Sequence, residues 1–478
     1  MLTFSLQILG WMLAHAPGFV LRLIALTFGR LILLIPRRRR IVFSNLHHAF
    51  PDRSHAWRMR IARASCVRLV ETGMLSLASP FLSDARIRKM VGVAPEIGAA
   101  LREHVSSGRP LILGTVHLAY WESLTWLGTF CRELVETGVI FRPLDNPALN
   151  AWVRTTRERH GMRLLSRRTG LQDAFRILRR GGIVSILFDQ NAGTQGALSL
   201  FMDRVCSTTE LPGMLAEKFG ALVHVFYARR TGFWRVRYEA ERIESDGTAG
   251  GVTLAMNRWL EKLLASDAEL CASWLWSHRR WHTQDGSWQR MRLGAKRDLL
   301  DADLALRGLT RETMPRRTRY FITMPETADG ARAAAPLLRR LRVARPDAEI
   351  TLLVEREGDV ARRSGGLFAA DFAADKIVEL PARASERRGV LRALRGGFPD
   401  VHVLFADSAR ADRDAAAINA PQRFGMGNKG RRRPRLTHLW ELPEENNAQP
   451  PALSPGRQWE LWWTALGLPA DDGSEAKT

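Results

Sequence analysis

The stretch Pro110-Leu-Ile-Leu-Gly-Thr-Val-His117-Leu-Ala-Tyr-Trp-Glu122 decides the fold of the first half of this 478-residue chain. Its apolar run is typical of a buried strand over 111–116, which places His117 on the next turn and Glu122 in the following helix. Five residues turn a helix by about 500°, so the two side chains cannot share one face of a regular helix. A neutral imidazole can accept a proton near pH 7, and a nearby carboxylate can fix its tautomer. The alternative interpretation is a surface histidine and a glutamate at a helix N-terminus.

A second apolar run, 183–188, ends on Asp189 and Gln190 and is followed by a turn rich in Asn and Gly. In α/β folds, ligands gather at the carboxyl ends of the strands, so this position predicts a functional residue. The alternative is an aspartate that only initiates the turn.

Further motifs accompany these two runs in a fixed order. They are Asn45-Leu-His-His-Ala-Phe-Pro51, Phe141-Arg-Pro-Leu-Asp-Asn-Pro147, Arg157-Glu-Arg-His-Gly161, Gly181-Gly-Ile-Val-Ser-Ile-Leu-Phe-Asp189-Gln-Asn-Ala-Gly193 and Trp274-Leu-Trp-Ser-His-Arg-Arg-Trp281. In this order and spacing the chain resembles the lipid A biosynthesis acyltransferases, a lysophospholipid acyltransferase-type family of the bacterial inner membrane. Those enzymes add secondary fatty acyl chains to the lipopolysaccharide precursor. The resemblance covers residues 1 to about 290.

The resemblance implies roles for four residues. His117 and Glu122 match the catalytic His-x4-Asp/Glu of the family, Arg157 an arginine of the Arg-x3-Gly type, and Asp189 the acid of the Asp-Gln block. It implies that His117 acts as general base on an acceptor hydroxyl and that Glu122 orients it. The donor would be an acyl thioester on acyl carrier protein or coenzyme A. We expect no cofactor and no metal.

Arginines near these motifs suit an anionic substrate. A guanidinium binds phosphate or carboxylate through a planar fork, and a lipid A precursor carries phosphates. The expected substrate-binding residues are Arg142, Asn146, Arg157, Asp189, Gln190, Arg279 and Arg280. For any single arginine the alternative is a solvated surface charge.

The N-terminal segment, 1–40, predicts a membrane anchor. It is strongly apolar up to residue 35, is broken at Pro17-Gly18, and closes on the basic cluster 37–40. One reading is a single span over about 2–21; the other is a hairpin-like or interfacial anchor whose arginines reach the lipid headgroups. A buried amphipathic helix is the third alternative. The basic cluster predicts that this end stays on the cytoplasmic side of the inner membrane.

Composition agrees with a membrane-surface enzyme that has anionic partners. The formal net charge is +22, from 71 Lys and Arg against 49 Asp and Glu. No nucleic-acid module is recognisable, so we expect a glycolipid or phospholipid acceptor, an acidic carrier protein and the membrane instead. The tryptophans of the 274–281 motif suit an interface or ordinary core packing. The four cysteines show no C-x-x-C pairing, which indicates reduced thiols.

A second α/β pattern begins near residue 318, after a charged linker over 291–317. We expect strands over 320–324, 349–354, 376–380 and 401–405 and a helix over 333–344, which together indicate a Rossmann-like parallel sheet. The stretches Tyr320-Phe-Ile-Thr-Met-Pro325, Arg345-Pro-Asp-Ala-Glu-Ile-Thr-Leu-Leu-Val-Glu355 and Phe398-Pro-Asp-Val-His-Val-Leu-Phe-Ala-Asp407 resemble the N-terminal half of the lipopolysaccharide heptosyltransferases, members of glycosyltransferase family 9.

That second resemblance has two departures. The Gly-Asp of the family is reversed here as Asp329-Gly330, and the chain ends before the half that binds the sugar nucleotide in that family. We therefore expect glycolipid recognition or partner docking from this part, and no glycosyl transfer.

The sequence predicts an α/β protein with four parts: a membrane anchor (1–40), an acyltransferase domain with a central mixed sheet flanked by helices (41–290), a linker (291–317) and a Rossmann-like half-domain (318–478). Its expected function is acyl transfer to a hydroxyl of a lipid A precursor. Two alternatives stay open. One is an acyltransferase for a phospholipid, ornithine lipid or phosphoinositide mannoside; the other is a non-catalytic scaffold for lipopolysaccharide synthesis.

Overall fold

The computed structural model describes residues 2–131, 135–282, 291–356, 373–427, 432–441 and 454–468. The chain divides into two units, one formed by residues 1–202 and 206–280 and the other by 203–205 and 281–478. The expected end of the acyltransferase domain at residue 290 lies outside the described residues.

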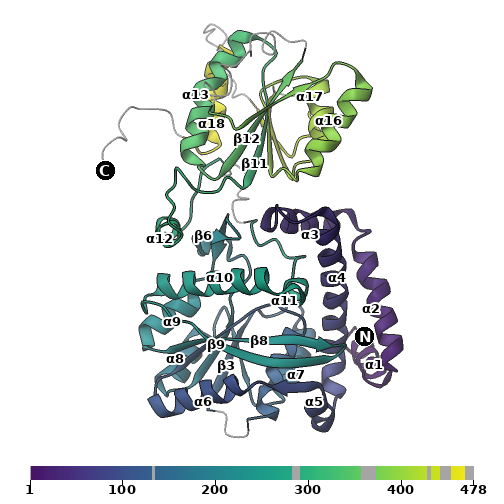
Figure 1. The fold of residues 1–478 in the computed structure, drawn as a ribbon, viewed down its shortest axis with the longest axis vertical. Coiled ribbons are helices and arrows are strands. Elements are labelled where there is room, and N and C mark those ends of the chain that lie inside the picture. Colours follow the sequence, from purple (N-terminus) through teal and green to yellow (C-terminus); the bar gives the residue numbers. More distant parts are fainter. Residues whose placement is uncertain are drawn as a thin grey trace. The chain divides into compact units, whose positions relative to one another are not determined.

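The first unit is built on a seven-stranded sheet in the order β1-β9-β8-β2-β5-β3-β4 (Figure 1). All neighbours are parallel except β8 and β9, so the sheet is mixed, as predicted. The strands are β1 (Val91–Val93), β2 (Leu111–Thr115), β3 (Thr137–Phe141), β4 (Arg163–Ser166), β5 (Ile183–Leu187), β8 (Leu222–Gly232) and β9 (Arg235–Arg242).

The two central strands determine where the candidate site lies. Every residue of β2 is buried, as its apolar run predicts, and β2 lies between β5 and β8. Thr115 pairs with Leu187. Since His117 and Asp189 each follow these partners by two residues, they leave the same edge of the sheet side by side.

Helices pack against this sheet, and two further short strands belong to the same region of the chain. The α-helices are α1 (Leu2–His15), α2 (Gly18–Ile32), α3 (Pro36–Ala49), α4 (His55–Ala78), α5 (Asp84–Met90), α6 (Pro95–Ser107), α7 (Pro147–Glu158), α8 (Leu171–Arg179), α9 (Leu211–Phe219), α10 (Ala249–Ser266) and α11 (Ala268–Ser273). The 3-10 helices are η1 (Ser79–Phe81), η2 (Trp121–Thr129) and η3 (Gly193–Gln195); β6 (Ala197–Phe201) and β7 (Arg204–Thr208) are two further strands.

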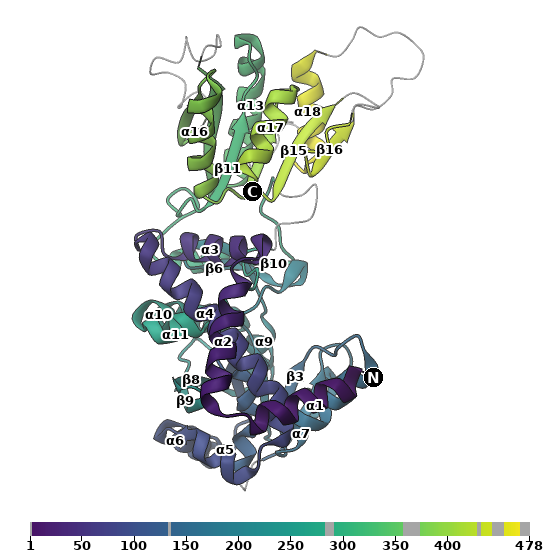
Figure 2. The same cartoon turned by 90° about the vertical axis from the view of Figure 1, so that its right-hand side faces the viewer.

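The apolar N-terminus forms two helices that lie along α4 (Figures 1 and 2). A continuous helix over 2–21 is not formed, because α1 ends at His15 and Pro17 caps α2. Gly29 lets α2 approach α4 closely, since a Cβ there would lie 2.6 Å from Cα of Val67. Within the described residues, no single helix has both the length and the apolar composition to cross a membrane. The pair α2 and α3, bent by 88°, has them only together.

The second unit contains a six-stranded, fully parallel sheet in the order β13-β12-β11-β14-β15-β16. In chain order this is 3-2-1-4-5-6, the strand order of a doubly wound dinucleotide-binding fold, which confirms the predicted Rossmann-like sheet. The strands are β11 (Thr318–Thr323), β12 (Ala348–Glu355), β13 (Lys376–Leu380), β14 (Val401–Leu404), β15 (Gln422–Gly427) and β16 (His438–Glu441).

Helices cover both faces of this sheet. Figure 1 shows α13 (Ala328–Ala344) and α18 (Pro455–Ala465) on one side, and α16 (Ala384–Gly396) and α17 (Ala409–Ile418) on the other. The segment expected as a linker contains β10 (Arg297–Asp298) and the short helix α12 (Leu300–Leu306).

Candidate active site

His117 and Asp189 form a buried pair at the carboxyl ends of β2 and β5. The imidazole Nδ1 lies 2.7 Å from one carboxylate oxygen of Asp189, and the backbone N–H of His117 donates to the other at 2.8 Å. The indole N–H of Trp274 donates to that second oxygen at 2.8 Å. An ionised carboxylate only accepts hydrogen bonds, so Nδ1 carries the proton and Nε2 keeps its lone pair. Nε2 lies 3.1 Å from the side-chain nitrogen of Gln190, which donates to it.

The environment keeps Asp189 ionised. Its complete burial by itself would raise the pKa of the carboxyl. The attraction of His117 and the hydrogen bonds from His117 and Trp274 outweigh burial and hold the pKa of Asp189 below its ordinary value. A permanent negative charge therefore faces the imidazole and can stabilise its protonated form.

Glu122 does not orient His117, contrary to the expectation from sequence. It lies at the start of η2, where Arg157 from α7 binds it through two hydrogen bonds of 2.8 and 2.6 Å. The indole of Trp121 donates to the same carboxylate at 3.2 Å, and its ring lies 5.3 Å from the imidazole of His117. Glu122 and Arg157 thus form a bidentate ion pair beside the dyad, and Asp189 has the place that was expected for Glu122.

The turn between His117 and Glu122 is held by α4. Tyr120 has a φ of 62°, a backbone conformation that costs a tyrosine on the order of 1 kcal/mol or more. Its backbone N–H donates to Thr72 at 2.9 Å, and its phenol donates to Glu71 at 2.5 Å and accepts from the N–H of Trp234 at 3.0 Å. Neither Thr72 nor Glu71 was expected as a site residue, since no motif surrounds them in the sequence.

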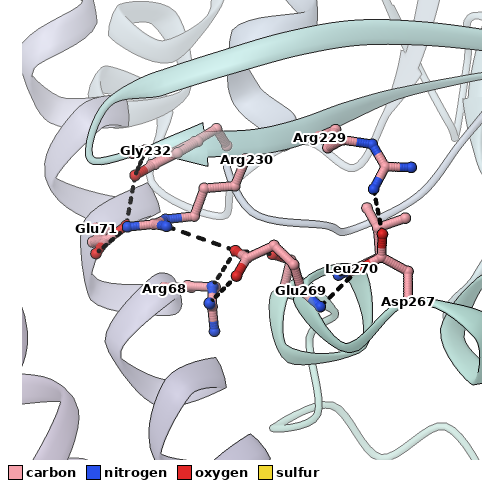
Figure 3. Close-up of polar contacts among 10 residues, drawn as sticks. Arg68, Glu71, Arg229, Arg230, Gly232, Asp267, Glu269 and Leu270 are labelled. Atoms are coloured by element: carbon pink, nitrogen blue, oxygen red, sulfur yellow. Dashed lines mark hydrogen bonds and ion pairs between the residues drawn. The ribbon is translucent and has the colours of Figure 1, made fainter.

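An ion network extends from Glu71 to α11 (Figure 3). Arg230 on β8 binds Glu71 at 2.8 and 3.3 Å and reaches Glu269 at 3.6 Å, and Arg68 on α4 binds Glu269 at 2.8 Å. Glu71 is only 4% exposed, so removing these partners would leave a buried carboxylate unpaired.

The loop after α11 contacts α3, α4 and the residues that follow β5. Asn45 on α3 donates to the carbonyls of Trp276 and His278 at 2.8 and 2.7 Å, and Ser65 on α4 donates to the carbonyl of Trp274 at 2.9 Å. Burial lowers the pKa of His278 to about 4, so this imidazole is neutral and accepts the N–H of Asn191 at 3.0 Å. Of the two expectations for the tryptophans of this motif, the structure supports core packing: Trp274, Trp276 and Trp281 are buried.

The two arginines of this loop differ. Arg280 is completely buried and donates to the carbonyl of Ser207 and, at 2.7 Å, to the hydroxyl of Thr208, so the expectation that it contacts substrate is wrong. Arg279 is half-buried, and burial together with the neighbouring charges of Arg37 and Arg38 lowers its pKa. Arg279 therefore belongs to a cluster of positive charge at the start of α3.

The remaining expected residues lie on the loop after β3. Arg142 follows the strand directly and is exposed. The side-chain oxygen of Asn146 accepts the N–H of Leu149 at 3.0 Å, so Asn146 caps the start of α7.

An apolar cavity begins beside the dyad. Trp121, Glu122 and Arg157 lie at one end, and side chains from one face of β2, β3 and β5 line it as far as Thr137. The other lining residues include Leu113, Leu124, Val139, Phe141, Met162, Leu164, Leu187 and Phe226. From Phe141 to Thr137 the strand spans about 13 Å.

Comparison with known proteins gives one family over the first unit. Residues 1–283 match the family described as bacterial lipid A biosynthesis acyltransferase. Among solved structures, the chain is similar to the glycosyl transferase family 9 protein from Veillonella parvula, with 19% identity and a TM-score of 0.26; the match covers 32% of this chain and 42% of that one. No curated protein matches the chain.

Proposed function

This chain belongs to the bacterial lipid A biosynthesis acyltransferases and is an acyltransferase of lipid A synthesis, and from this premise we propose that it transfers a fatty acyl chain from a thioester to a hydroxyl of a lipid A precursor. The observation that carries the mechanism is the 2.7 Å contact between Nδ1 of His117 and Asp189, which leaves Nε2 as the base. The amide of Gln190 has the position from which the acceptor hydroxyl would approach.

The proposed reaction needs one proton to move twice. Nε2 of His117 takes the hydroxyl proton as that oxygen bonds to the thioester carbon, and Asp189 stabilises the imidazolium. The tetrahedral intermediate then collapses, its carbon–sulfur bond breaks, and the departing thiolate takes the proton from Nε2. Arg157, whose guanidinium Glu122 holds in place, is the group that we propose to stabilise charge on the carbonyl oxygen.

The cavity below Glu122 and Arg157 is the proposed site of the acyl chain. Its walls are mostly apolar side chains of the sheet and η2, and one of them, Trp121, contacts His117. The donor is an acyl thioester of acyl carrier protein or coenzyme A. No cofactor or metal enters the mechanism.

We propose that the outer face of α1 and α2 lies in the cytoplasmic leaflet of the inner membrane. Large apolar side chains are exposed there, which is unusual for helices packed on a soluble core. They are Phe4, Ile8, Leu9, Trp11, Met12, Phe19, Leu23, Leu26, Phe28 and Leu31, followed by Leu34 and Ile35. The basic residues 37–40 come next and suit anionic headgroups, and Arg279 beside them is the proposed contact for an acceptor phosphate.

The second unit is proposed to recognise the growing glycolipid or a second enzyme. We expect the full chain to transfer no sugar from a sugar nucleotide. Detection of a glycosylated lipid product by mass spectrometry would contradict that part of the proposal.

The test of the main proposal uses the purified full chain in detergent, acyl carrier protein thioesters, and a lipid A precursor as acceptor. We expect one acyl chain to be added per acceptor, and His117→Ala to reduce the rate by about 10²–10⁴-fold. A phospholipid, an ornithine lipid and a phosphoinositide mannoside serve as competing acceptors. If all four lipids stayed unmodified with a folded protein, the scaffold alternative would replace this proposal.

A further inference from the structure

Two exposed arginines that no motif includes lie at the same edge of the sheet as the dyad. Arg167 and Arg168 follow β4 directly, and Arg142 follows β3. Since β2, β5, β3 and β4 are adjacent and parallel, the residues that follow them emerge at one edge in the order His117, Asp189, Arg142, Arg167. With about 4.8 Å between strands, β4 is about 14 Å from β2.

The loops that carry these arginines are held in place. The N–H of Arg167 donates to the carbonyl of Phe141 at 2.9 Å, which joins the two strand ends. Arg168 donates from its N–H to the hydroxyl of Ser166 at 3.2 Å, and the turn closes where Gly170 donates to the carbonyl of Ser166 at 2.7 Å. A Cβ on Gly170 would lie 2.7 Å from the backbone nitrogen of Ser166, so only glycine fits this turn without a shift. The backbone positions of Arg167 and Arg168 are therefore defined before any ligand binds.

The guanidinium groups of these arginines are available for a ligand, whereas neighbouring ones are used within the protein. Arg154, Arg163 and Arg176 each pair with a carboxylate. Within the described part of the chain, the side chains of Arg142, Arg167 and Arg168 have no such carboxylate partner, and Asp145 is the acidic residue on the same loop as Arg142. The result is a row of positive charge that starts near the mouth of the apolar cavity and ends at the edge strand.

A thioester bound in that cavity would point its other end toward this row. With the acyl chain in the cavity and the carbonyl at His117, the sulfur and everything beyond it would lie outside the cavity, near Trp121, Glu122 and Arg157, which line it. Thioesters of both acyl carrier protein and coenzyme A carry a phosphate beyond the sulfur. The proposed acceptor cluster around Arg279 lies on the loop after α11, and the carbonyl of Arg279 accepts from the side chain of Asn191, after β5, at 3.3 Å. The proposed donor and acceptor arginines thus lie on different loops.

Resting on the proposed function, we propose that Arg142, Arg167 and Arg168 form the binding site for the phosphate of the acyl thioester donor. A guanidinium fork binds phosphate through paired charge-assisted hydrogen bonds, and three of them in a row suit a phosphodiester or a nucleotide phosphate. The site separates the donor phosphate from the acceptor phosphates, so the two anionic substrates bind together without sharing arginines.

The test compares two consecutive arginine pairs in the full chain. Arg167→Gln/Arg168→Gln removes the proposed site. Arg179→Gln/Arg180→Gln removes the same charge from the end of α8, at the opposite edge of the sheet, and serves as the matched control. Each variant is assayed with acyl carrier protein thioester, acyl coenzyme A and acyl pantetheine, which has no phosphate. Arg142→Gln is assayed in the same way.

We expect the 167/168 variant to raise KM for the two phosphate-bearing donors by about 10-fold or more, with kcat and the KM for acyl pantetheine unchanged. A rise for both donors assigns the site to the pantetheine phosphate, and a rise for coenzyme A alone assigns it to the nucleotide phosphates. Equal rises of KM in the two arginine-pair variants would overturn the proposal, because they would indicate a general electrostatic effect of the positive charge. An equal rise of KM for acyl pantetheine would overturn it as well. If the unaltered chain transferred from none of the donors, the proposed function itself would fail instead.

Discussion

The phenol of Tyr120 donates a 2.5 Å hydrogen bond to the buried carboxylate of Glu71, which joins α4 to the residue three positions after His117. One face of α4 thereby contacts the turn between His117 and Glu122, while α1 and α2 pack elsewhere along the same helix. Because Tyr120 has a positive φ, the turn would relax to another conformation without these contacts. The distance between His117 and Glu122 therefore depends on a helix that carries neither residue.

Tyr120→Phe should lower both stability and turnover. The phenol is one partner of Glu71 and the acceptor for the buried N–H of Trp234. Its loss leaves that N–H without a partner and Glu71 bound to Arg230, at about 1–3 kcal/mol. We expect kcat to fall more than KM rises, because the dyad moves while the cavity stays. Denaturant unfolding and steady-state kinetics measure the two effects.

The matched control for Tyr120→Phe is Tyr227→Phe. Tyr227 also donates to a glutamate that an arginine binds, with 2.7 Å from its phenol to Glu239, but this pair joins β8 and β9 away from the turn. The control should lose some stability and keep kcat. Equal loss of kcat in both variants would mean that Glu71 and Tyr120 only stabilise the fold.

Asp189→Asn should abolish most transfer without altering the shape of the site. The amide oxygen can still accept from the N–H of His117 and from Trp274, which forces the amide NH₂ toward Nδ1. Nδ1 must then accept, so the proton moves to Nε2 and the base is lost. We expect kcat to fall by about 10⁴-fold, as in the serine protease triad, with KM within a few-fold.

The tautomer can be checked directly by ¹⁵N NMR of the His117 ring in both proteins. If Asp189→Asn kept near-normal kcat, His117 would be activated by a different group, and Glu122→Gln would become the decisive variant.

Sequence predicted the sheet better than it predicted the partners within the site. The apolar runs before His117 and Asp189 were enough to identify β2 and β5, because a central strand that is buried on both faces is a continuous apolar run in the sequence. Which carboxylate meets the imidazole could not be predicted in this way. The spacing of His117 and Glu122 within one segment suggested a local pair, whereas the register of Thr115 with Leu187 brings in an aspartate 72 residues away. Arg280 was misassigned for a related reason: its burial depends on Ser207 and Thr208, which are distant in the chain.

Glu122 and Arg157 should behave as one unit. In a double-mutant cycle with Glu122→Gln and Arg157→Gln, we expect each single change to lower kcat/KM strongly and the double variant to be little worse than either, since each residue holds the other. Arg157→Lys should also lower kcat/KM, because a point charge cannot replace two hydrogen bonds from one planar group.

The control cycle uses Arg154 and Glu158, an exposed pair on the same helix, and should show coupling below about 0.5 kcal/mol in stability. Strictly additive losses at Glu122 and Arg157 would show that the two act independently.

Stability should fall in acid through His278. Burial lowers the pKa of this imidazole to about 4 in the folded protein, below the ordinary value of 6.5, so the unfolded chain binds the extra proton first. Because of that difference, the contribution of this group to the unfolding free energy is fully present above pH 6.5. It is lost as pH falls from about 6.5 to 4, by roughly 2–3 kcal/mol. His278→Gln should flatten that part of the curve, since an amide keeps an acceptor for Asn191 without titrating. An unchanged slope of unfolding free energy against pH would assign the acid sensitivity to other buried histidines such as His402.

Arg279 and Arg280 are adjacent, but their substitution should affect different properties: acceptor binding for Arg279 and stability for Arg280. Arg280→Met removes a completely buried guanidinium and its hydrogen bonds to the carbonyl of Ser207 and the hydroxyl of Thr208, so we expect a loss of about 1–3 kcal/mol in unfolding free energy. The KM of the protein that still folds should stay normal, because this guanidinium does not reach a substrate.

Arg279→Gln should do the opposite, with unfolding free energy within about 0.5 kcal/mol and a raised KM for a phosphorylated acceptor. Its repulsion by Arg37 and Arg38 predicts that Arg37→Gln/Arg38→Gln raises the same KM in the same direction. Thermal unfolding and acceptor titrations on the three variants decide the matter, and a dephosphorylated acceptor provides the control. A raised KM for both acceptors alike would mean that Arg279 shapes the site and binds no phosphate.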